Sequence, residues 1–221
     1  FRTCLMKEQQ MKRVILISLL LSLTFLVSSQ ETSITTGWRA IRASEVSVDG
    51  GVLTTEDPAP EGWINATVPG TVLTTLVNNG LMPDPWFGMN NEEIPDIWDA
   101  GRDYYTYWFF TRFSIPELDS TRQVWLNFRG INYRAEVWLN GRLISDSIID
   151  GMFLRRKYNV TDILNTDGHN RLAVRVEPPL NPGKPNGGQG GDGRIGRDVT
   201  MQFTAGWDWI QPVRDRNTGI W

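Results

Sequence analysis

The sequence predicts an antiparallel β-sandwich with a few short peripheral helices. Residues Arg122–Gly130 and Arg134–Ile144 alternate apolar and polar side chains with the period of a half-buried strand. In the second segment Asn140-Gly141 supplies the positive backbone angles of a tight hairpin turn. Helical periodicity is sparse, so these strands favour an all-β, antiparallel architecture.

Other elements follow from local composition. Tyr104–Ile115 is rich in aromatic and β-branched residues, and Arg171–Val176 alternates again, so both are predicted strands. Trp125 interrupts the polar face of the first alternating segment. Thr71–Asn79 is the clearest helix, with a hydroxyl cap at its start and Gly80 at its end.

Two long stretches, Met82–Asp103 and Pro178–Arg197, have no periodicity and contain several prolines or glycines. Long connections of this kind in compact domains usually carry function.

The N-terminus has the layout of a secretory signal. Met11 is followed by two basic residues and by an apolar run, Val14–Val27, that is shorter than the ~20 residues of a membrane span. We interpret residues 1–10 as upstream read-through, 11–29 as a signal peptide and 30–221 as the domain. The alternatives are a buried core helix and an uncleaved anchor. Export to the periplasm or outside the cell is expected, with no membrane contact after cleavage.

Charge and cysteine content narrow the possible partners. Removing the four basic residues and one acidic residue of the first 29 leaves 18 basic and 24 acidic residues, a net charge of −6. Nucleic acid is therefore not an expected partner. The single cysteine, Cys4, precedes the domain, which has no disulfide. Asn65 and Asn159 begin Asn-x-Thr triplets, which are glycosylation acceptors in a host that glycosylates exported proteins.

Several kinds of site are excluded by motif. Gly188–Gly193 matches a dinucleotide fingerprint but follows a loop instead of a strand, so nucleotide binding is rejected. His169 is the only histidine and no calcium-loop spacing occurs, so no metal and no cofactor are expected. No Gly-x-Ser-x-Gly elbow is present.

The constellation that suits a carbohydrate is Gly206-Trp207-Asp208-Trp209. Sugars offer apolar faces that stack on indole rings, and hydroxyl pairs that donate to a carboxylate. The alternative is that Trp207 and Trp209 cover the end of the sandwich and Asp208 caps a turn. The residues alone leave both open.

Two further charged segments are interpreted as mainly structural. Asp215, between Arg214 and Arg216, is expected in an ion-pair network rather than a pocket rim. The acidic run from Glu92 to Asp103 is expected to be mostly solvated, with Asn91-Glu92 the part to test.

Seven segments follow one another in a characteristic order: Val68–Val72, Pro83–Gly88, Gly101–Thr106, Asn127–Tyr133, Gly151–Phe153, Gly206–Ile210 and Arg214–Trp221. Together they resemble family 2 glycoside hydrolases, in the branch of the mannosylglycoprotein endo-β-mannosidases and exo-β-glucosaminidases.

The resemblance implies a multi-domain retaining β-glycosidase whose N-terminal domain is a galactose-binding-like jelly roll. Two catalytic glutamates would lie in a barrel beyond Trp221, so this chain would hold no catalytic residue and its partners would be a β-linked glycoside and its own barrel. Asp208 would hold sugar hydroxyls, Trp207 or Trp209 would wall the sugar, and Asn91 would also reach the pocket. The alternatives are a free-standing carbohydrate-binding module without catalysis and a sandwich with no ligand.

Overall fold

The computed structural model describes residues 30–56, 61–115, 122–145, 149–165, 168–184, 196–198, 200–201 and 212–221. Of two compact units along the chain, the second, Ile34–Trp221, contains the fold. The predicted site residues Trp207, Asp208 and Trp209 lie outside the described residues.

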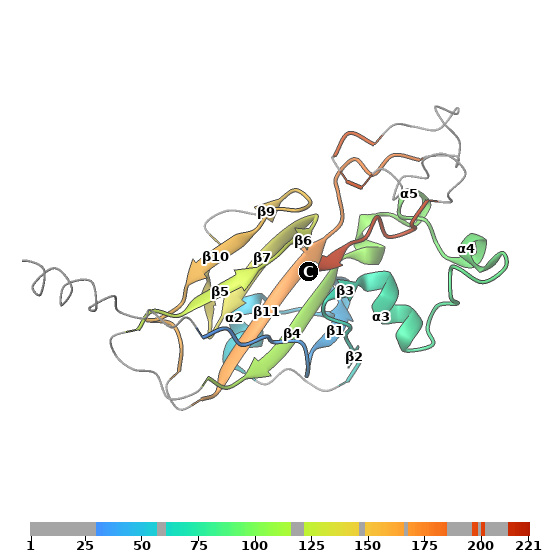
Figure 1. Ribbon diagram of the computed structural model, residues 1–221. Coiled ribbons are helices and arrows are strands. Elements are labelled where there is room, and N and C mark those ends of the chain that lie inside the picture. The colour runs from blue at the N-terminus through green and yellow to red at the C-terminus, as the bar shows by residue number, and fades with distance from the viewer. Residues whose placement is uncertain are drawn as a thin grey trace, which may run out of the picture. The chain divides into compact units, whose positions relative to one another are not determined.

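The fold is built on one large antiparallel sheet in the order β2-β1-β4-β11-β7-β8, with β9 paired to β7. The long strands β4 and β11 run side by side through its middle (Figure 1). Its strands are β1 (Arg39–Arg42), β2 (Ile64–Asn65), β4 (Tyr107–Phe113), β7 (Arg134–Leu139), β8 (Arg142–Leu143), β9 (Ile149–Asp150) and β11 (Asn170–Glu177).

Two smaller antiparallel sheets complete the sandwich. One pairs β5 (Trp125–Phe128) with β10 (Arg156–Asn159), and the other has the order β3-β12-β6. The bounds of the latter strands are β3 (Gly70–Thr71), β6 (Ile131–Asn132) and β12 (Gly219–Ile220). The main core contains side chains from the large sheet, such as Phe109 and Val174, together with Phe128 and Ile220 from the smaller sheets. Alternating apolar residues are therefore buried between layers, and the predicted antiparallel sandwich is confirmed.

The predicted hairpin and helix are confirmed where individual residues favour a particular turn or cap. The hairpin between β7 and β8 turns at Asn140 and Gly141, with φ of 49° and 83°. The predicted helix is α3 (Val72–Asn78), whose cap Thr71 accepts from the backbone N–H of Thr74 at 3.0 Å. The predicted strand at 104–115 begins later, because Arg102–Tyr105 forms the 3-10 helix η2.

Helical turns also occur where no period was visible. The stretch Met82–Asp103 contains α4 (Asn90–Glu93) and α5 (Ile97–Ala100). Before β2, the chain forms η1 (Ala43–Glu45) and α2 (Gly50–Thr55), which contribute to a second apolar cluster on the other face of the large sheet. Turns of three to six residues are too short to show helical periodicity.

The C-terminal strand β12 requires glycine. It pairs with both β3 and β6, and a Cβ on Gly219 would meet the carbonyl oxygen of Gly70 and lie 2.6 Å from the Cα of Thr71. We expect Gly219→Ala to destabilise the domain by about 1–3 kcal/mol, since backbone must move to admit the methyl group. Thermal unfolding measures this, at roughly 2–4 °C per kcal/mol.

Gly130→Ala is the matched control for Gly219→Ala. Gly130 hydrogen-bonds to Trp221 at the end of the same strand, but its Cβ would meet only ordinary contacts, the nearest at 3.7 Å. Equal losses of Tm in the two variants would contradict the steric explanation.

Candidate functional site

Asn91 links the stretch Met82–Asp103 to the residues that follow the Gly206–Trp209 motif. It lies on α4 and is half-buried. Its side-chain amide donates to the carbonyl of Pro212 at 3.4 Å, and its own carbonyl accepts from Nε of Arg214 at 2.8 Å. Asn91 is thus held next to the point where the described chain resumes after residues 202–211.

The same two segments are tied together by a buried ion pair. Nη1 and Nη2 of Arg216 donate to the two carboxylate oxygens of Asp96 at 2.9 and 3.0 Å. The Arg216 side chain is 0% exposed and that of Asp96 is 6% exposed. Asp96 also caps α5 by accepting from the N–H of Trp98, and Arg214 lies 3.6 Å from the same carboxylate. A bidentate pair of this burial fixes geometry and is costly to break.

Arg216 also anchors the second long connection. Its remaining donors reach backbone carbonyls of Pro182 (3.3 Å), Gly183 (3.1 Å) and Val213 (2.8 Å). Each of the five guanidinium N–H groups has a partner, so the buried cation is fully hydrogen-bonded. Three segments that are far apart in sequence therefore meet at one side chain.

Asp215 points the other way, toward α3. Its carboxylate accepts from the backbone N–H groups of Leu73 and Asn217, both at 2.9 Å, and the residue is wholly buried. Burial raises the pKa of Asp215 to about 6, against hydrogen bonds and the Arg216 charge, which lower it. The expected structural role of the Arg214–Arg216 segment is confirmed. The ion pair is not formed between neighbours in the sequence, however, because Arg216 pairs with Asp96 and not with Asp215.

The turn that carries these charges is held in an uncommon backbone conformation. Arg216 and Asn217 have φ of 51° and 57°, which few residues other than glycine adopt. The side-chain amide of buried Asn132, on β6, donates to both of their carbonyls at 2.7 Å. The core of the sandwich therefore positions the turn directly.

The sequence did not indicate that Asp96 and Arg216 are partners. Asp96 belonged to a run interpreted as solvated, and that interpretation is wrong for this residue, whereas Glu92, Glu93 and Asp99 are exposed as expected. The sequence did contain one signal at Asp96, since an aspartate directly after a proline is typical of a helix cap. Such a signal predicts a local turn, but it does not predict an ion pair with a distant arginine.

Large apolar side chains on the connection before Asn91 are exposed. Leu81, Trp86, Phe87 and Met89 are 55%, 81%, 74% and 65% exposed. Exposed large apolar side chains that cluster are typical of surfaces that contact another protein or a ligand.

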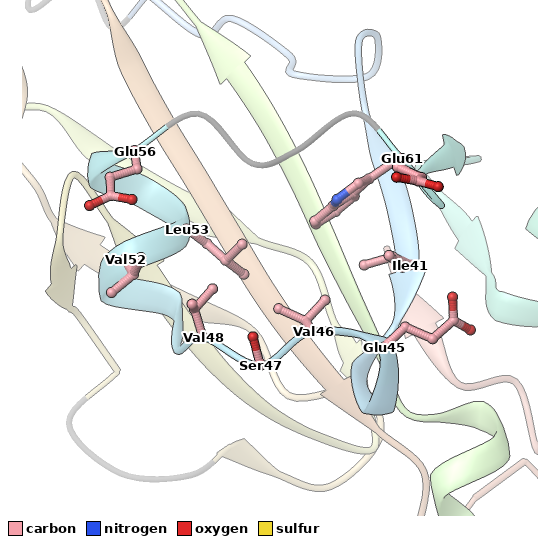
Figure 2. A pocket seen from close by; sticks show the side chains of 10 residues that line it. Ile41, Glu45, Val46, Ser47, Val48, Val52, Leu53, Glu56 and Glu61 are labelled. Carbon is pink, nitrogen blue, oxygen red and sulfur yellow. The ribbon is translucent and has the colours of Figure 1, made fainter.

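A separate hollow of about 280 Å³ opens on the other face of the large sheet, between η1, α2 and Trp63. Figure 2 shows Leu53, Val46 and Ile41 between the carboxylate of Glu56 on one side and those of Glu45 and Glu61 on the other. Asn91, the predicted site residue that the structure describes, does not line it.

Within the described residues, no helix combines the length and apolar character needed to cross a bilayer. In that same part of the chain, no group of three or more His, Cys, Asp or Glu side chains is placed to hold a metal ion.

The fold is a jelly-roll β-sandwich of the galactose-binding-like type. The chain belongs to the family described as the glycosyl hydrolase 2 galactose-binding domain-like domain, whose model matches residues 43–221. The resemblance deduced from the sequence motifs is therefore confirmed.

Named relatives agree with this membership. The chain is 54% identical over 191 residues to the mannosylglycoprotein endo-β-mannosidase of Lilium longiflorum, covering 84% of this chain and 20% of that enzyme. It is 28% identical over 191 residues to an exo-β-D-glucosaminidase of Streptomyces avermitilis, covering 86% of this chain and 18% of that enzyme.

A solved structure shows the same arrangement. The crystal structure of the β-D-mannosidase from Dictyoglomus thermophilum matches with a TM-score of 0.62 and 28% identity, over 87% of this chain and 22% of that one. The chain thus spans about a fifth of the length of these relatives.

Proposed function

We propose that this chain is the N-terminal domain of an exported retaining β-glycosidase of the β-mannosidase or exo-β-glucosaminidase type, and that it helps to position the sugar for hydrolysis of its glycosidic bond. The observation that carries the proposal is the anchoring of Asn91 to Pro212 and Arg214, which follow Trp207, Asp208 and Trp209 closely in the sequence.

The chemistry assigns separate tasks to the two parts of such an enzyme. Retaining hydrolysis needs two carboxyl groups ~5–5.5 Å apart, one as nucleophile and one as acid and base. In this proposal the catalytic barrel supplies both. The present chain supplies a carboxylate, Asp208, for sugar hydroxyls and the indoles of Trp207 and Trp209 for the apolar face of the ring.

The buried Asp96–Arg216 pair supports this division of tasks. A residue that orients a substrate must be held within a fraction of an ångström, which requires a rigid base. The pair, with Asn132 below it, immobilises the turn a few residues after Asp208. The exposed apolar residues Trp86 and Phe87 are then the surface on which the barrel packs.

Export is part of the proposal and rests on residues 11–29, with the mature chain beginning near Gln30.

The alternative to a glycosidase domain is a free-standing carbohydrate-binding module. The two differ in whether the domain binds sugar by itself.

The 221-residue chain alone should hydrolyse no aryl β-mannoside or aryl β-glucosaminide above background, and should bind the corresponding sugars weakly or not at all. The reason is that the barrel completes the pocket and holds both catalytic carboxyls. Release of the chromophore measures hydrolysis and calorimetry measures binding, with the full-length protein as positive control. Turnover by the chain alone would contradict the domain assignment, and tight sugar binding without turnover would favour the free-standing module.

A further inference from the structure

The two Asn-x-Thr triplets differ in how the fold holds them. Asn159 is the last residue of β10 and Asn65 the last of β2, and both are exposed. Such triplets are acceptors for N-linked oligosaccharide in exported proteins, and a glycan is tolerated only where it stays in solvent. Exposure does not separate the two sites, and among the described residues the amide nitrogen Nδ2 has no hydrogen bond at either one. The partners of the amide oxygen and of the threonine hydroxyl do separate them.

At Asn159 the amide and the threonine hydroxyl face each other. The amide oxygen Oδ1 accepts from the hydroxyl of Thr161 at 2.7 Å and from its backbone N–H at 3.1 Å. The hydroxyl in turn accepts from the backbone N–H of Val124 at 2.9 Å, which fixes its direction. Both bonds engage the oxygen side of the amide, and among the described residues Nδ2 of Asn159 has no hydrogen bond. The nitrogen that would carry a glycan is therefore left to solvent.

An exposed tryptophan lies directly across from this amide. In the antiparallel register of β5 and β10, Asn159 is opposite Trp125, and the two strands run side by side (Figure 1). Trp125 is 48% exposed. Directly opposite residues have Cβ atoms about 4.5–5.5 Å apart, within reach of a sugar attached to one and an indole on the other.

The triplet at Asn65 is arranged differently. Oδ1 of Asn65 accepts from Nη1 of Arg39 at 2.8 Å, and the hydroxyl of Thr67 accepts from Nδ2 of Asn78 at 2.8 Å. The backbone N–H of Thr67 donates to Thr75, and the carbonyl of Asn65 accepts from Asn79. This triplet is therefore bound into the fold by α3 and β1, and the amide and hydroxyl are committed to different partners.

We propose that Asn159 carries an N-linked oligosaccharide whose first sugar stacks on Trp125. The donor is an oligosaccharide linked to a polyprenyl diphosphate in the export pathway of the host. Nδ2 loses one proton and forms a bond to the anomeric carbon of the first sugar, while the bond from that carbon to the diphosphate breaks and the diphosphate leaves with the electron pair. The inference rests on the export proposed above.

The test is secretion of the full chain from eukaryotic cells that glycosylate exported proteins, once with its own residues 11–29 and once with a leader of the host. Intact mass is measured before and after treatment with an amidase that removes N-glycans. The variants are Asn159→Gln, Asn65→Gln as the matched control, and Trp125→Ala. We expect one glycan, lost in Asn159→Gln and retained in the other two.

The outcomes separate the inference from the export proposal. If the chain is secreted and glycosylated with the host leader but not with its own residues 11–29, the export proposal is overturned. Loss of the glycan in Asn159→Gln would then still support Asn159 as the acceptor. A secreted chain without glycan, or with a glycan on Asn65 and not on Asn159, would overturn the inference.

The role of Trp125 has its own measurement. Removing the glycan should lower Tm by roughly 2–4 °C in the otherwise unchanged chain, and by about zero in Trp125→Ala, because the sugar then has no indole to cover. Equal losses in both backgrounds would overturn the stacking of the sugar on Trp125.

Discussion

In the full-length enzyme, Asp208→Ala should lower kcat/KM by roughly 10²-fold or more, which corresponds to about 3 kcal/mol of transition-state stabilisation. A carboxylate that accepts from two sugar hydroxyls makes two charge-assisted hydrogen bonds of about 1.5–3 kcal/mol each. Losing both accounts for the expected effect. Steady-state hydrolysis of an aryl β-glycoside gives the ratio, and thermal unfolding of the same variant gives its stability.

The alternative role of Asp208 predicts the opposite pattern. If Asp208 caps a turn, the variant should melt several degrees lower and keep its kcat/KM once folded. Asp99→Ala is the control for removing a carboxylate, because Asp99 is exposed and, within the described part of the chain, its ion pair is with Lys184 on the surface. An unchanged kcat/KM in Asp208→Ala would remove this residue from the site.

Asp96→Ala should destabilise the domain by about 3–5 kcal/mol, because it leaves the guanidinium of Arg216 buried without its carboxylate. The variant also removes the cap of α5. For a chain of this size the loss corresponds to a fall in Tm of roughly 6–20 °C. Circular dichroism during heating measures it.

Two comparisons decide whether the buried pair is the cause. Asp99→Ala lies on the same helix but breaks an exposed pair, so it should cost no more than about 1 kcal/mol. Adding Arg216→Leu to Asp96→Ala should recover part of the loss, since no unpaired charge then remains. Similar Tm values for the two aspartate variants, or a further loss in the double variant, would contradict the explanation.

Much of the architecture follows from local signals. The strands β5, β7 and β11 carry a largely alternating apolar pattern, and the turn at Asn140-Gly141 needs residues that accept positive φ. These features depend on neighbours within a few residues, so a sequence pattern predicts them. The short helices α2, α4 and α5 lack such a pattern, because four to six residues do not complete enough turns.

The candidate site divides in the same way. Asn91 and the Gly206–Trp209 motif were visible in the sequence, the first through its resemblance to a family and the second also through its chemistry. That Asn91 contacts Pro212 could not be foreseen, because the two residues are 121 positions apart and only the tertiary fold brings them together.

By itself, the sequence determined the antiparallel sandwich, the hairpin, helix α3 and membership of a glycoside hydrolase family, since these depend on period, turn chemistry and motif order. Only the tertiary structure decided which charges are buried together. Asp96 and Arg216 are 120 residues apart, and Asp215, adjacent to Arg216, turns instead to Leu73. Whether Arg216 pairs with Asp96 or with Asp215 depends on where the fold places each side chain. It also depends on which pair can satisfy all its hydrogen bonds away from water.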